Sequence, residues 1–461
     1  MTAEPAATRL LGSLRENYTH AVIAFIDEDG YPLSVATGFE PVPDQGIVLL
    51  DGVAGDDVRP PEGREVNVVF SHIRPQPGQG YDERRYVSLW GTLRRTDGKL
   101  ELRPARVQHW DEQEMTFFEF SERGVPQAQR YMKSLSKELG RPVKPQLPAG
   151  WLFLRATRLP FLTATVIPIG LGIAVAAFHG SWHWWLAILT LIGGACIHLA
   201  LNVANDVFDT TSGADQANVT PTQFSGGSRV ILYGLLSLRQ MVLLMLGFYA
   251  VGVGIGLYLA VTRAFWPLFI LGAAGLFISV FYTAPPFRLV HRGVGEICVA
   301  LGFGPIMTLG AYYVQAQRWS WEALYASLPV AILIALVLYM NEVPDRPGDG
   351  AAGKRTLPVR WSQQAVLLGY ASSVAAAFGL ILGGALSDVL VRPAILALAA
   401  APLAVSVYRG FREHYDEPYA LMPHMAKNIQ LHLATGMLLI VGYIIAIVAS
   451  HISGHPPVFL R

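Results

Sequence analysis

Nine long apolar segments follow Arg158, and they constrain the fold more than any other feature of the chain. Each has roughly 18–25 residues, enough for a helix to cross a hydrocarbon core of about 30 Å. The predicted spans are residues 159–179, 184–205, 237–260, 265–283, 294–314, 322–342, 364–386, 391–408 and 429–450. Only 15% of the residues are charged, against about 25% in a soluble globular protein. The sequence therefore predicts an all-α membrane domain of nine transmembrane helices over residues 158–461.

The first 157 residues differ in character, because they contain 19 of the 35 Lys and Arg and 22 of the 34 Asp and Glu. Short apolar runs alternate there with Asp-Gly turns, from HAVIAFI at residue 20 to KLELRPARV at residue 99. Such runs are typical of antiparallel strands, here forming a small barrel or sandwich. Residues 111–140 predict one or two helices. We divide this multi-domain chain into a soluble β-barrel domain with helices at 1–145, a proline-rich linker at 146–157 and the membrane domain.

The distribution of positive charge predicts the orientation of the protein in the membrane. With the N-terminus in the cytoplasm, eleven Lys and Arg lie in or beside the cytoplasmic loops and four on the opposite side. Cytoplasmic loops are the ones enriched in positive charge. The first 20 residues lack the apolar core of a signal peptide. We therefore expect a multi-pass protein of the lipid bilayer, in a prokaryotic plasma membrane, with its N-terminal domain in the cytoplasm.

Charge and cysteine content exclude several other classes of protein. The formal net charge is +1 and no basic run is interleaved with aromatic residues, which argues against nucleic acid as a partner. Cys196 and Cys298 are the two cysteines, and both lie in apolar runs. They form neither a disulfide framework nor a thiolate metal site. Nothing in the sequence indicates the oligomeric state.

Aspartates cluster at two places in the membrane domain. Five of the seven Asp residues after residue 157 lie in two predicted cytoplasmic loops. They are Asp206, Asp209, Asp215, Asp345 and Asp349. The first group ends the second span and the second group ends the sixth, and spans four apart run in the same direction. Both groups are therefore expected at one membrane face.

The spacing of the first group suggests a cation site. If the second span stays helical to its end, Asn202, Asp206 and Asp209 share one face of the helix. Converging carboxylates repel each other unless cations lie between them, and Mg²⁺ suits carboxylates that also share it with phosphate oxygens. The predicted ligand is a diphosphate with Mg²⁺. The alternative for any single loop is that its Asp residues only cap a helix end.

Basic residues near these carboxylates could bind the diphosphate oxygens. The candidates are Arg229 after FSGGS, Arg288 after YTAPPF, and the neighbours Lys354 and Arg355. Arginine presents a planar fork to phosphate and lysine a mobile point charge. Together with Mg²⁺ they would stabilise the charge that builds up on a departing pyrophosphate.

Three further polar residues lie at the ends of the spans. Asn202 and Asn341 could serve the site or form hydrogen bonds between helices. Glu296 lies near the start of the fifth span. A carboxylate in a membrane is costly, which favours a functional role, although this side chain could instead extend to the interface.

On these residues the chain resembles the UbiA superfamily of intramembrane aromatic prenyltransferases, over roughly residues 150–450. The family signatures N-D-x-x-D and D-x-x-x-D are matched by Asn205, Asp206 and Asp209, and by Asp345 and Asp349. The stretches YTAPPFRLVHRGVGE, FGPIMTLGAYYVQ and AAGKRTLPVR are similar to the 1,4-dihydroxy-2-naphthoate prenyltransferases of menaquinone synthesis. The resemblance implies nine helices around a cavity open to the membrane.

The resemblance also implies a mechanism and roles for the site residues. Mg²⁺ held by the four motif aspartates draws the diphosphate away, and an electron-rich carbon of the aromatic acceptor attacks the allylic cation. Dihydroxynaphthoate also loses its carboxylate. Asn202 and Asn205 are assigned to the diphosphate site, and Tyr282 is the loop tyrosine expected near the diphosphate or the cation, which an aromatic face can stabilise.

The second motif departs from the family pattern. Glu342 stands where the family commonly has Asp, and Pro344 and Pro347 interrupt the motif. Because proline removes a backbone donor, Asp345 and Asp349 are expected on an unwound helix end. The segment NVTPTQFSGGSRV also differs from the corresponding family loop, so another quinone precursor stays open as the acceptor.

The N-terminal domain resembles the pyridoxamine-phosphate-oxidase-like split barrel, a fold that often binds flavin. The resemblance rests on the order of strands with REVNVVFSHI and RRYVSLWGTLRR. It implies FMN as a candidate cofactor, with Arg64, Arg84 and Arg85 as candidate phosphate ligands. Arginines at such positions are otherwise solvated residues of strand edges.

Two rival functions belong to other classes. A transporter would also use carboxylates in the membrane, but near the midplane and between repeats, whereas these Asp groups lie at one face. A membrane-anchored flavoprotein would use the helices only as a scaffold and would leave the paired Asp groups unexplained.

Overall fold

The computed structural model describes residues 4–27, 30–51, 60, 62–76, 80–96, 98–143, 145, 147–218 and 221–453. The chain forms two compact units, Met1–Gly124 and Val125–Arg461. The boundary between them falls inside helix α2 (Phe117–Glu138), upstream of residue 145.

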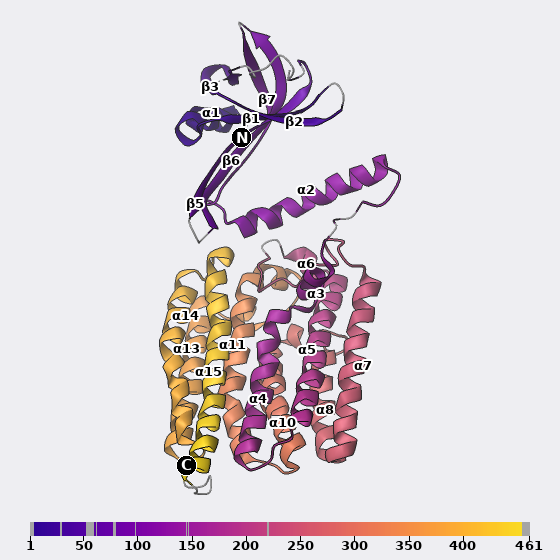
Figure 1. Cartoon of the computed structure of the whole chain (residues 1–461), viewed down its shortest axis with the longest axis vertical. Helices are drawn as coiled ribbons and strands as arrows, with labels where there is room; N and C mark the ends of the chain where they lie inside the picture. The colour runs from indigo at the N-terminus through magenta and orange to yellow at the C-terminus, as the bar shows by residue number, and fades with distance from the viewer. Residues whose placement is uncertain are drawn as a thin grey trace. The chain divides into compact units, whose positions relative to one another are not determined.

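Unit 1 is an antiparallel sheet with one helix packed on it (Figure 1). The elements are α1 (Glu4–Asn17), β1 (Ala21–Ile26), β2 (Pro32–Thr37), β3 (Phe39–Val42), β4 (Ile47–Leu50), β5 (Glu65–Gln76), β6 (Gly80–Thr96) and β7 (Lys99–Asp111). The strand order is β2-β1-β5-β6-β7-β4-β3. Among the described pairings β2 and β3 are the two edges, so the sheet is confirmed, whereas closure into a split barrel stays a prediction.

Buried and less buried residues alternate along strand β1, and the buried ones contribute to the core of unit 1. Ala21, Ile23 and Phe25 of β1 are buried on one face, and the residues between them are less buried. Leu11 and Leu14 of α1 cover the same core. A period of two in burial is what a sheet covered on one face requires.

The arginines proposed for flavin have different surroundings. Arg84 donates from Nε to Glu112 Oε2 at 3.0 Å, and its guanidinium lies over the ring of Trp110. Arg64 is exposed, and the buried Nε of Arg85 has no hydrogen-bond partner among the described residues. Flavin binding stays a prediction, and absorbance at flavin wavelengths in the purified protein would test it.

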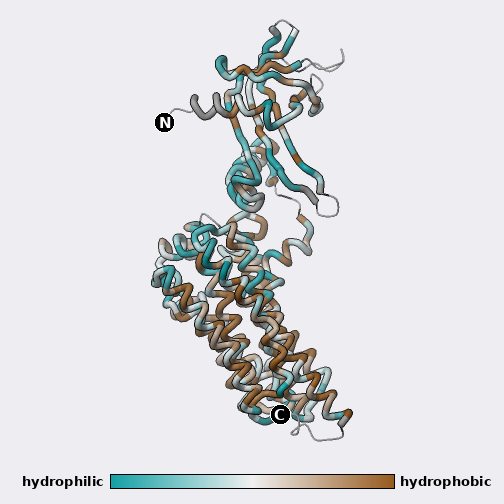
Figure 2. Tube along the Cα trace, turned by 90° about the vertical axis from the view of Figure 1, so that its left-hand side faces the viewer, coloured by the Kyte–Doolittle hydropathy of each residue, from teal (hydrophilic) through white to brown (hydrophobic). Residues whose placement is uncertain are grey.

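Unit 2 is helical. After α3 (Ala149–Thr157) the helices are α4 (Thr163–Phe178), α5 (Trp184–Ser212), α6 (Ala214–Ala217), α7 (Leu238–Arg263), α8 (Phe265–Phe281), α9 (Gly295–Leu301), α10 (Met307–Ala316), α11 (Trp321–Ala351), α12 (Leu357–Arg360), α13 (Gln363–Leu386), α14 (Ala401–Glu413) and α15 (Pro418–Ser453). A π-helical turn, η4 (Gly302–Ile306), joins α9 to α10, and a 3₁₀ segment, η5 (Arg392–Ala400), leads into α14. Helix α4 packs against α5, α10, α11 and α15. Figure 2 shows apolar residues concentrated along these helices.

Eight helical segments in the described part of the chain are long and apolar enough to cross a membrane. They are Leu159–Phe178, Trp184–Ser212, Leu238–Arg263, Gly295–Ala316, Trp321–Ala351, Gln363–Leu386, Arg392–Glu413 and Pro418–Ile452. The predicted span at 265–283 corresponds to α8, a shorter apolar helix of 17 residues. The structure thus supports eight spans, and the ninth stays a prediction.

Residues 149–157 of the predicted linker form helix α3, since the prolines stop at Pro148 and apolar helix formers follow, and the linker between domains stays a prediction. One local prediction was wrong, because helix α11 continues through Pro344 and Pro347 to Ala351 instead of unwinding. Pro347 cannot donate to the carbonyl of Val343, but the Arg346 side chain does so from Nε at 2.8 Å. This substitute donor satisfies the acceptor that the proline leaves free.

A buried polar network lies where α4 ends and α11 begins. Glu322 Oε1 accepts from the Tyr443 hydroxyl at 2.9 Å, and Glu322 Oε2 lies 3.0 Å from His179 Nε2. His179 Nδ1 lies 2.8 Å from the Tyr312 hydroxyl. The network ties α4, α10, α11 and α15 together and partners both oxygens of this buried carboxylate, as burial of a charge requires.

Candidate functional site

Helix α5 carries the first aspartate group because it remains helical to Ser212. Asp206 and Asp209 are three residues apart and therefore lie on one helix face. Both are buried, with 2% and 9% of their surface exposed. The predicted shared face is thus present, and it points into the protein instead of toward lipid.

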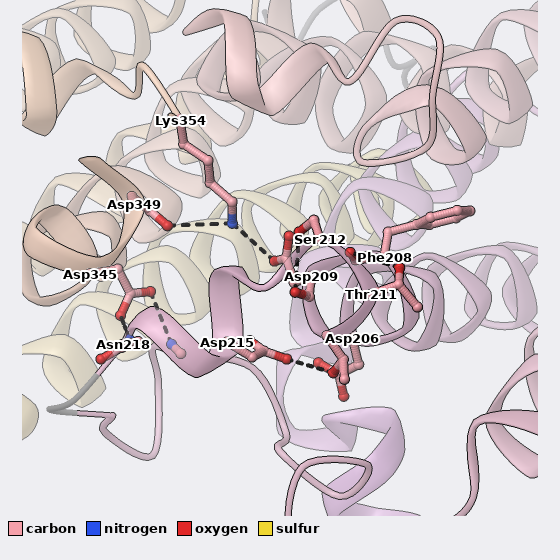
Figure 3. Close-up of polar contacts among 12 residues, drawn as sticks. Asp206, Phe208, Asp209, Thr211, Ser212, Asp215, Asn218, Asp345, Asp349 and Lys354 are labelled. Carbon is pink, nitrogen blue, oxygen red and sulfur yellow. Dashed lines mark hydrogen bonds and ion pairs between the residues drawn. The ribbon is translucent and has the colours of Figure 1, made fainter. Parts of the chain in front are cut away.

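Helix α11 carries the second group, and Lys354 joins it to the first (Figure 3). Lys354 Nζ lies 3.0 Å from Asp209 Oδ2 and 3.3 Å from Asp349 Oδ1. The ammonium group is buried between the two carboxylates. This contact confirms that the two groups, which are far apart in the sequence, meet at one end of the helices.

The loop after α6 donates hydrogen bonds to both aspartate groups. Ser228 N–H donates to Asp206 Oδ1 at 3.0 Å, and Gly226 N–H donates to Asp345 Oδ2 at 2.9 Å. Asn218 Nδ2 donates to Asp345 Oδ1 at 2.7 Å. Gly227 has a φ of +74°, and a Cβ there would lie about 3.0 Å from Asp215 Oδ1. Glycine is needed here for both the backbone conformation and the close approach.

Two residues assigned to the diphosphate form contacts within the protein. Arg229 is buried, and its Nη2 donates to the carbonyls of Asp215, at 2.9 Å, and Asn218. Asn202 Nδ2 donates to the carbonyl of Thr157 at 3.0 Å. Arg229 therefore shapes the loop, and Asn202 ties α5 to α3. Their contact with a diphosphate stays a prediction.

The other predicted residues differ in exposure. Arg288 and Arg355 are exposed, and the Arg355 backbone N–H donates to the His291 carbonyl at 3.1 Å. The Asn205 Oδ1 atom and the Tyr282 hydroxyl are buried without a protein hydrogen-bond partner among the described residues. These two orphaned polar groups are available to a ligand.

Sequence reasoning missed one cation. Arg158 caps α3 with a left-handed backbone at φ 52°, and its charge acts on both Asp206 and Asp345. It was overlooked because it precedes the first apolar segment, where a basic residue ordinarily only sets topology. Its position at the same membrane face as the Asp groups was the available signal.

The charges around the site are only partly balanced. Burial, followed by repulsion from Asp209 and Asp206, raises the pKa of Asp215 to about 7. Burial disfavours the Lys354 ammonium, but attraction to Asp209 and Asp349 outweighs it and raises the pKa of Lys354 above its ordinary value. Lys354, Arg158 and Arg229 thus lie among a larger number of carboxylates than they can neutralise, so additional cations are favoured.

The residues fit a magnesium ion that binds together with phosphate. Asp206 Oδ2, Asp209 Oδ1 and Asn205 Oδ1 are buried oxygens without hydrogen-bond partners, and Mg²⁺ prefers oxygen ligands. Within the described ranges no three His, Cys, Asp or Glu side chains converge to hold an ion by themselves. Mg²⁺ needs only one or two carboxylates if phosphate and water complete its shell.

An apolar cavity of about 390 Å³ begins beside this site. It is lined by α5, α7, α8 and the segment from α9 to α10, with many glycines in its wall. Tyr282 and Leu201 line the end nearest Asp209. The fold and site therefore define a multi-pass membrane protein with a cluster of buried carboxylates and an apolar cavity that share helix α5.

Comparison with known proteins agrees with this class. The UbiA prenyltransferase family matches residues 165–432, so the chain belongs to that family. It is a membrane prenyltransferase.

Several named relatives extend over the membrane domain. A 2-carboxy-1,4-naphthoquinone phytyltransferase of Synechocystis sp. is 30% identical over 63% of this chain and 92% of its own length. A 1,4-dihydroxy-2-naphthoate octaprenyltransferase of Bacillus subtilis is 24% identical over 68% of this chain and 99% of its own. An enzyme of the same name from Mycobacterium tuberculosis is 31% identical over 53% of this chain and 80% of its own.

Solved structures are similar at lower identity. A UbiA homologue from Archaeoglobus fulgidus bound to GPP and Mg²⁺ has a TM-score of 0.43 and 16% identity, covering 63% of this chain and 99% of that one. An apo UbiA homologue from Aeropyrum pernix has a TM-score of 0.45 and 17% identity, covering 61% and 97%.

Proposed function

We propose that this protein transfers a prenyl group from a prenyl diphosphate to an aromatic quinone precursor, first of all 1,4-dihydroxy-2-naphthoate, in a reaction that requires Mg²⁺. The observation that carries the proposal is the position of Tyr282, which lines the apolar cavity and also interacts with Asp209 of the carboxylate cluster. On one side lie buried carboxylate and amide oxygens without partners, and on the other an apolar cavity. A prenyl diphosphate has this division into a charged head and an apolar tail.

The residues of the chain divide the work of ionising the donor. The unpartnered oxygens of Asp206 and Asp209 would hold Mg²⁺, which would supply Lewis-acid stabilisation of the departing diphosphate. Lys354, already charged and buried, moves from Asp209 and Asp349 toward a phosphate oxygen. The ring of Tyr282 stabilises the allylic cation. The apolar cavity keeps water from that cation.

The acceptor class is inferred from the relatives. Their names specify 1,4-dihydroxy-2-naphthoate or 2-carboxy-1,4-naphthoquinone, so a bicyclic aromatic acid is the first acceptor to test. Glu342 and the loop before Arg229 depart from the family pattern, and another quinone precursor is the alternative. A transporter is disfavoured because the carboxylates gather at the ends of α5 and α11.

The orientation is part of the proposal. We expect the helix ends that carry the Asp groups to face the cytoplasm of a prokaryotic cell, and the N-terminal domain to be cytoplasmic, in accordance with the excess of Lys and Arg in those loops. A cysteine-labelling experiment on intact cells, with single cysteines introduced at Ser212 and Trp319, would test this orientation. We expect an impermeant reagent to label the cysteine at residue 319 and not the one at residue 212. The opposite labelling would contradict the proposed orientation.

The central experiment measures transfer directly. Purified protein in detergent is incubated with labelled geranylgeranyl diphosphate, dihydroxynaphthoate and Mg²⁺, and we expect a prenylated product that disappears with EDTA and returns with excess Mg²⁺. The same assay is run with other aromatic acceptors. The absence of metal-dependent product from every acceptor would contradict the proposal.

The cavity yields a separate prediction about donor length. Gly256 lines the cavity, and a Cβ there meets no atom within 4 Å, so a Gly256→Phe side chain would project into free space. We expect kcat/KM to fall about tenfold to a hundredfold more for geranylgeranyl than for geranyl diphosphate, as when a pocket rejects extra methylene groups.

Gly254→Phe provides the matched control. Gly254 lies on the same helix, also with nothing within 4 Å of its Cβ position, but it does not line the cavity. Competition assays with both donors measure the ratio of kcat/KM for geranylgeranyl diphosphate to kcat/KM for geranyl diphosphate. An equal loss for the two donors in the Gly256 variant would show that the cavity does not hold the prenyl chain.

A further inference from the structure

Two buried glutamates lie one layer deeper than the aspartates. Glu342 precedes Asp345 by three residues on α11, which places it on the same side of the helix and closer to the centre of the membrane domain. Glu296 lies in the first turn of α9. They are 6% and 8% exposed. Neither is among the residues assigned above to the diphosphate.

The two carboxyl groups adjoin each other and Tyr282. Glu296 and Glu342 interact with each other, and both act on the Tyr282 hydroxyl. That hydroxyl packs over the backbone of Gly295, the residue before Glu296, since a Cβ on this glycine would lie 3.2 Å from it. Leu338, one turn before Glu342, packs in the same cluster as Tyr282 and Cys298. The three polar side chains therefore form one group.

This group lacks the partners that buried carboxylates need. Apart from the contact between the two carboxyl groups themselves, both Glu342 oxygens, Glu296 Oε1 and the Tyr282 hydroxyl have no hydrogen-bond partner among the described residues. By contrast, Glu322 at the other end of α11 has a partner for each oxygen. Leaving buried charged or polar groups unsatisfied is costly, so the cluster points to a ligand that supplies hydrogen-bond donors.

The position of the cluster indicates which ligand this is. If the diphosphate binds at Asp206 and Asp209 and the prenyl chain fills the cavity, the carbon that joins them must pass Tyr282, which lines the cavity and interacts with Asp209. The glutamates beside Tyr282 therefore face the reacting carbon. An acceptor that attacks this carbon would place its own polar groups against them.

We propose that Glu296 and Glu342 bind a ring hydroxyl of the aromatic acceptor and take its proton during the attack; this inference rests on the proposed function. The ring carbon next to the hydroxyl forms the new bond to the prenyl carbon, and the carbon–oxygen bond of the donor breaks with its electron pair leaving on the diphosphate. The hydroxyl proton passes to a carboxylate, and the oxygen becomes a ketone.

The proton is then returned. When the attacked carbon carries a carboxylate, that group leaves as carbon dioxide, and its bonding electrons restore the ring while the ketone oxygen takes back the proton from the glutamate. Two adjacent carboxyl groups that share one proton suit both steps, because one can accept while the other remains neutral. No oxidant or further reactant is needed.

Glu296→Gln and Glu342→Gln test the proposal, because each keeps the size of the side chain and removes the proton acceptor. We expect kcat to fall about a hundredfold or more in each, as general-base loss does, while Mg²⁺-dependent equilibrium binding of labelled geranylgeranyl diphosphate is unchanged. Glu322→Gln is the matched control, a buried glutamate at the far end of α11 whose replacement should leave kcat as in wild type.

A second readout separates chemistry from structure. Wild-type protein should strongly prefer the free acceptor over its methyl ether at the hydroxyl next to the attacked carbon, and both variants should lose most of this preference. The proposal would be overturned if the variants kept wild-type kcat or kept the wild-type preference for the free acceptor. Loss of donor binding in the variants would also overturn it, because it would assign Glu296 and Glu342 to the metal site. If wild-type protein forms no product, the proposed function itself fails.

Discussion

Replacing Asp206 by asparagine is expected to lower kcat/KM for prenyl transfer by about a thousandfold, which corresponds to roughly 4 kcal/mol of transition-state stabilisation. Asparagine retains an oxygen that can accept the Ser228 N–H, so the loop should keep its conformation. The negative charge and the unpartnered Oδ2 are lost. Initial rates over a range of Mg²⁺ concentrations measure the effect, and more Mg²⁺ should restore only part of the rate.

Asp416→Asn is the control for this substitution. Asp416 is exposed and pairs with Arg346 at 2.8 Å, in the loop that follows α14. An exposed ion pair contributes little, so this variant should turn over like wild type. Comparable rates for the Asp206 and Asp416 variants would remove the proposed metal site.

Replacing Lys354 by methionine is expected to affect both folding and catalysis. The variant leaves Asp209 and Asp349 without the buried cation between them, and breaking a buried ion pair costs about 3–5 kcal/mol. The melting temperature in detergent should drop, and Mg²⁺ should raise it more than in wild type because a cation can replace the ammonium. We expect kcat to fall at least a hundredfold, because a buried hydrogen-bond donor to the leaving group is lost. This fall corresponds to a rise of about 3 kcal/mol in the activation free energy.

The pH dependence of the same contact has a definite sign. The folded pKa of Lys354 is raised, so its stabilising contribution is complete below the ordinary lysine pKa and disappears as the pH rises through the raised folded value.

Lys427→Met is the control for the Lys354 substitution. Lys427 is partly buried and its Nζ lies 3.5 Å from Ser406 Oγ, so this variant should change the melting temperature little. Equal melting temperatures with and without Lys354 would contradict the structural role assigned to it.

The two aspartate groups show how far sequence reasoning reaches. Apolar length placed the second and sixth spans, and direction along the chain brought their ends to one face, as the contact of Lys354 with Asp209 and Asp349 confirms. These inferences succeed because membrane thickness and helix rise leave few alternatives. The continuation of α11 through its prolines was predicted wrongly, because propensity cannot anticipate that Arg346 replaces the missing donor.

Roles of individual basic residues depended on contacts between distant segments. Arg229 and Lys354 both follow an Asp group in the sequence, yet Arg229 bonds loop carbonyls and Lys354 bridges the carboxylates. Arg158, from a segment read only as the start of the membrane domain, acts on both groups. Nothing local distinguishes these three cations.

The sequence by itself determined the division into a charged N-terminal part and a membrane domain, the helical spans and the two aspartate groups at one face, because hydropathy and spacing are properties of short segments. Only the tertiary structure decided which polar atoms are buried without partners, where the apolar cavity begins and that Glu296 adjoins Glu342 beside Tyr282. Those facts depend on side chains from α5, α8, α9 and α11 meeting in space, and packing between helices far apart in the chain is not encoded in any single segment.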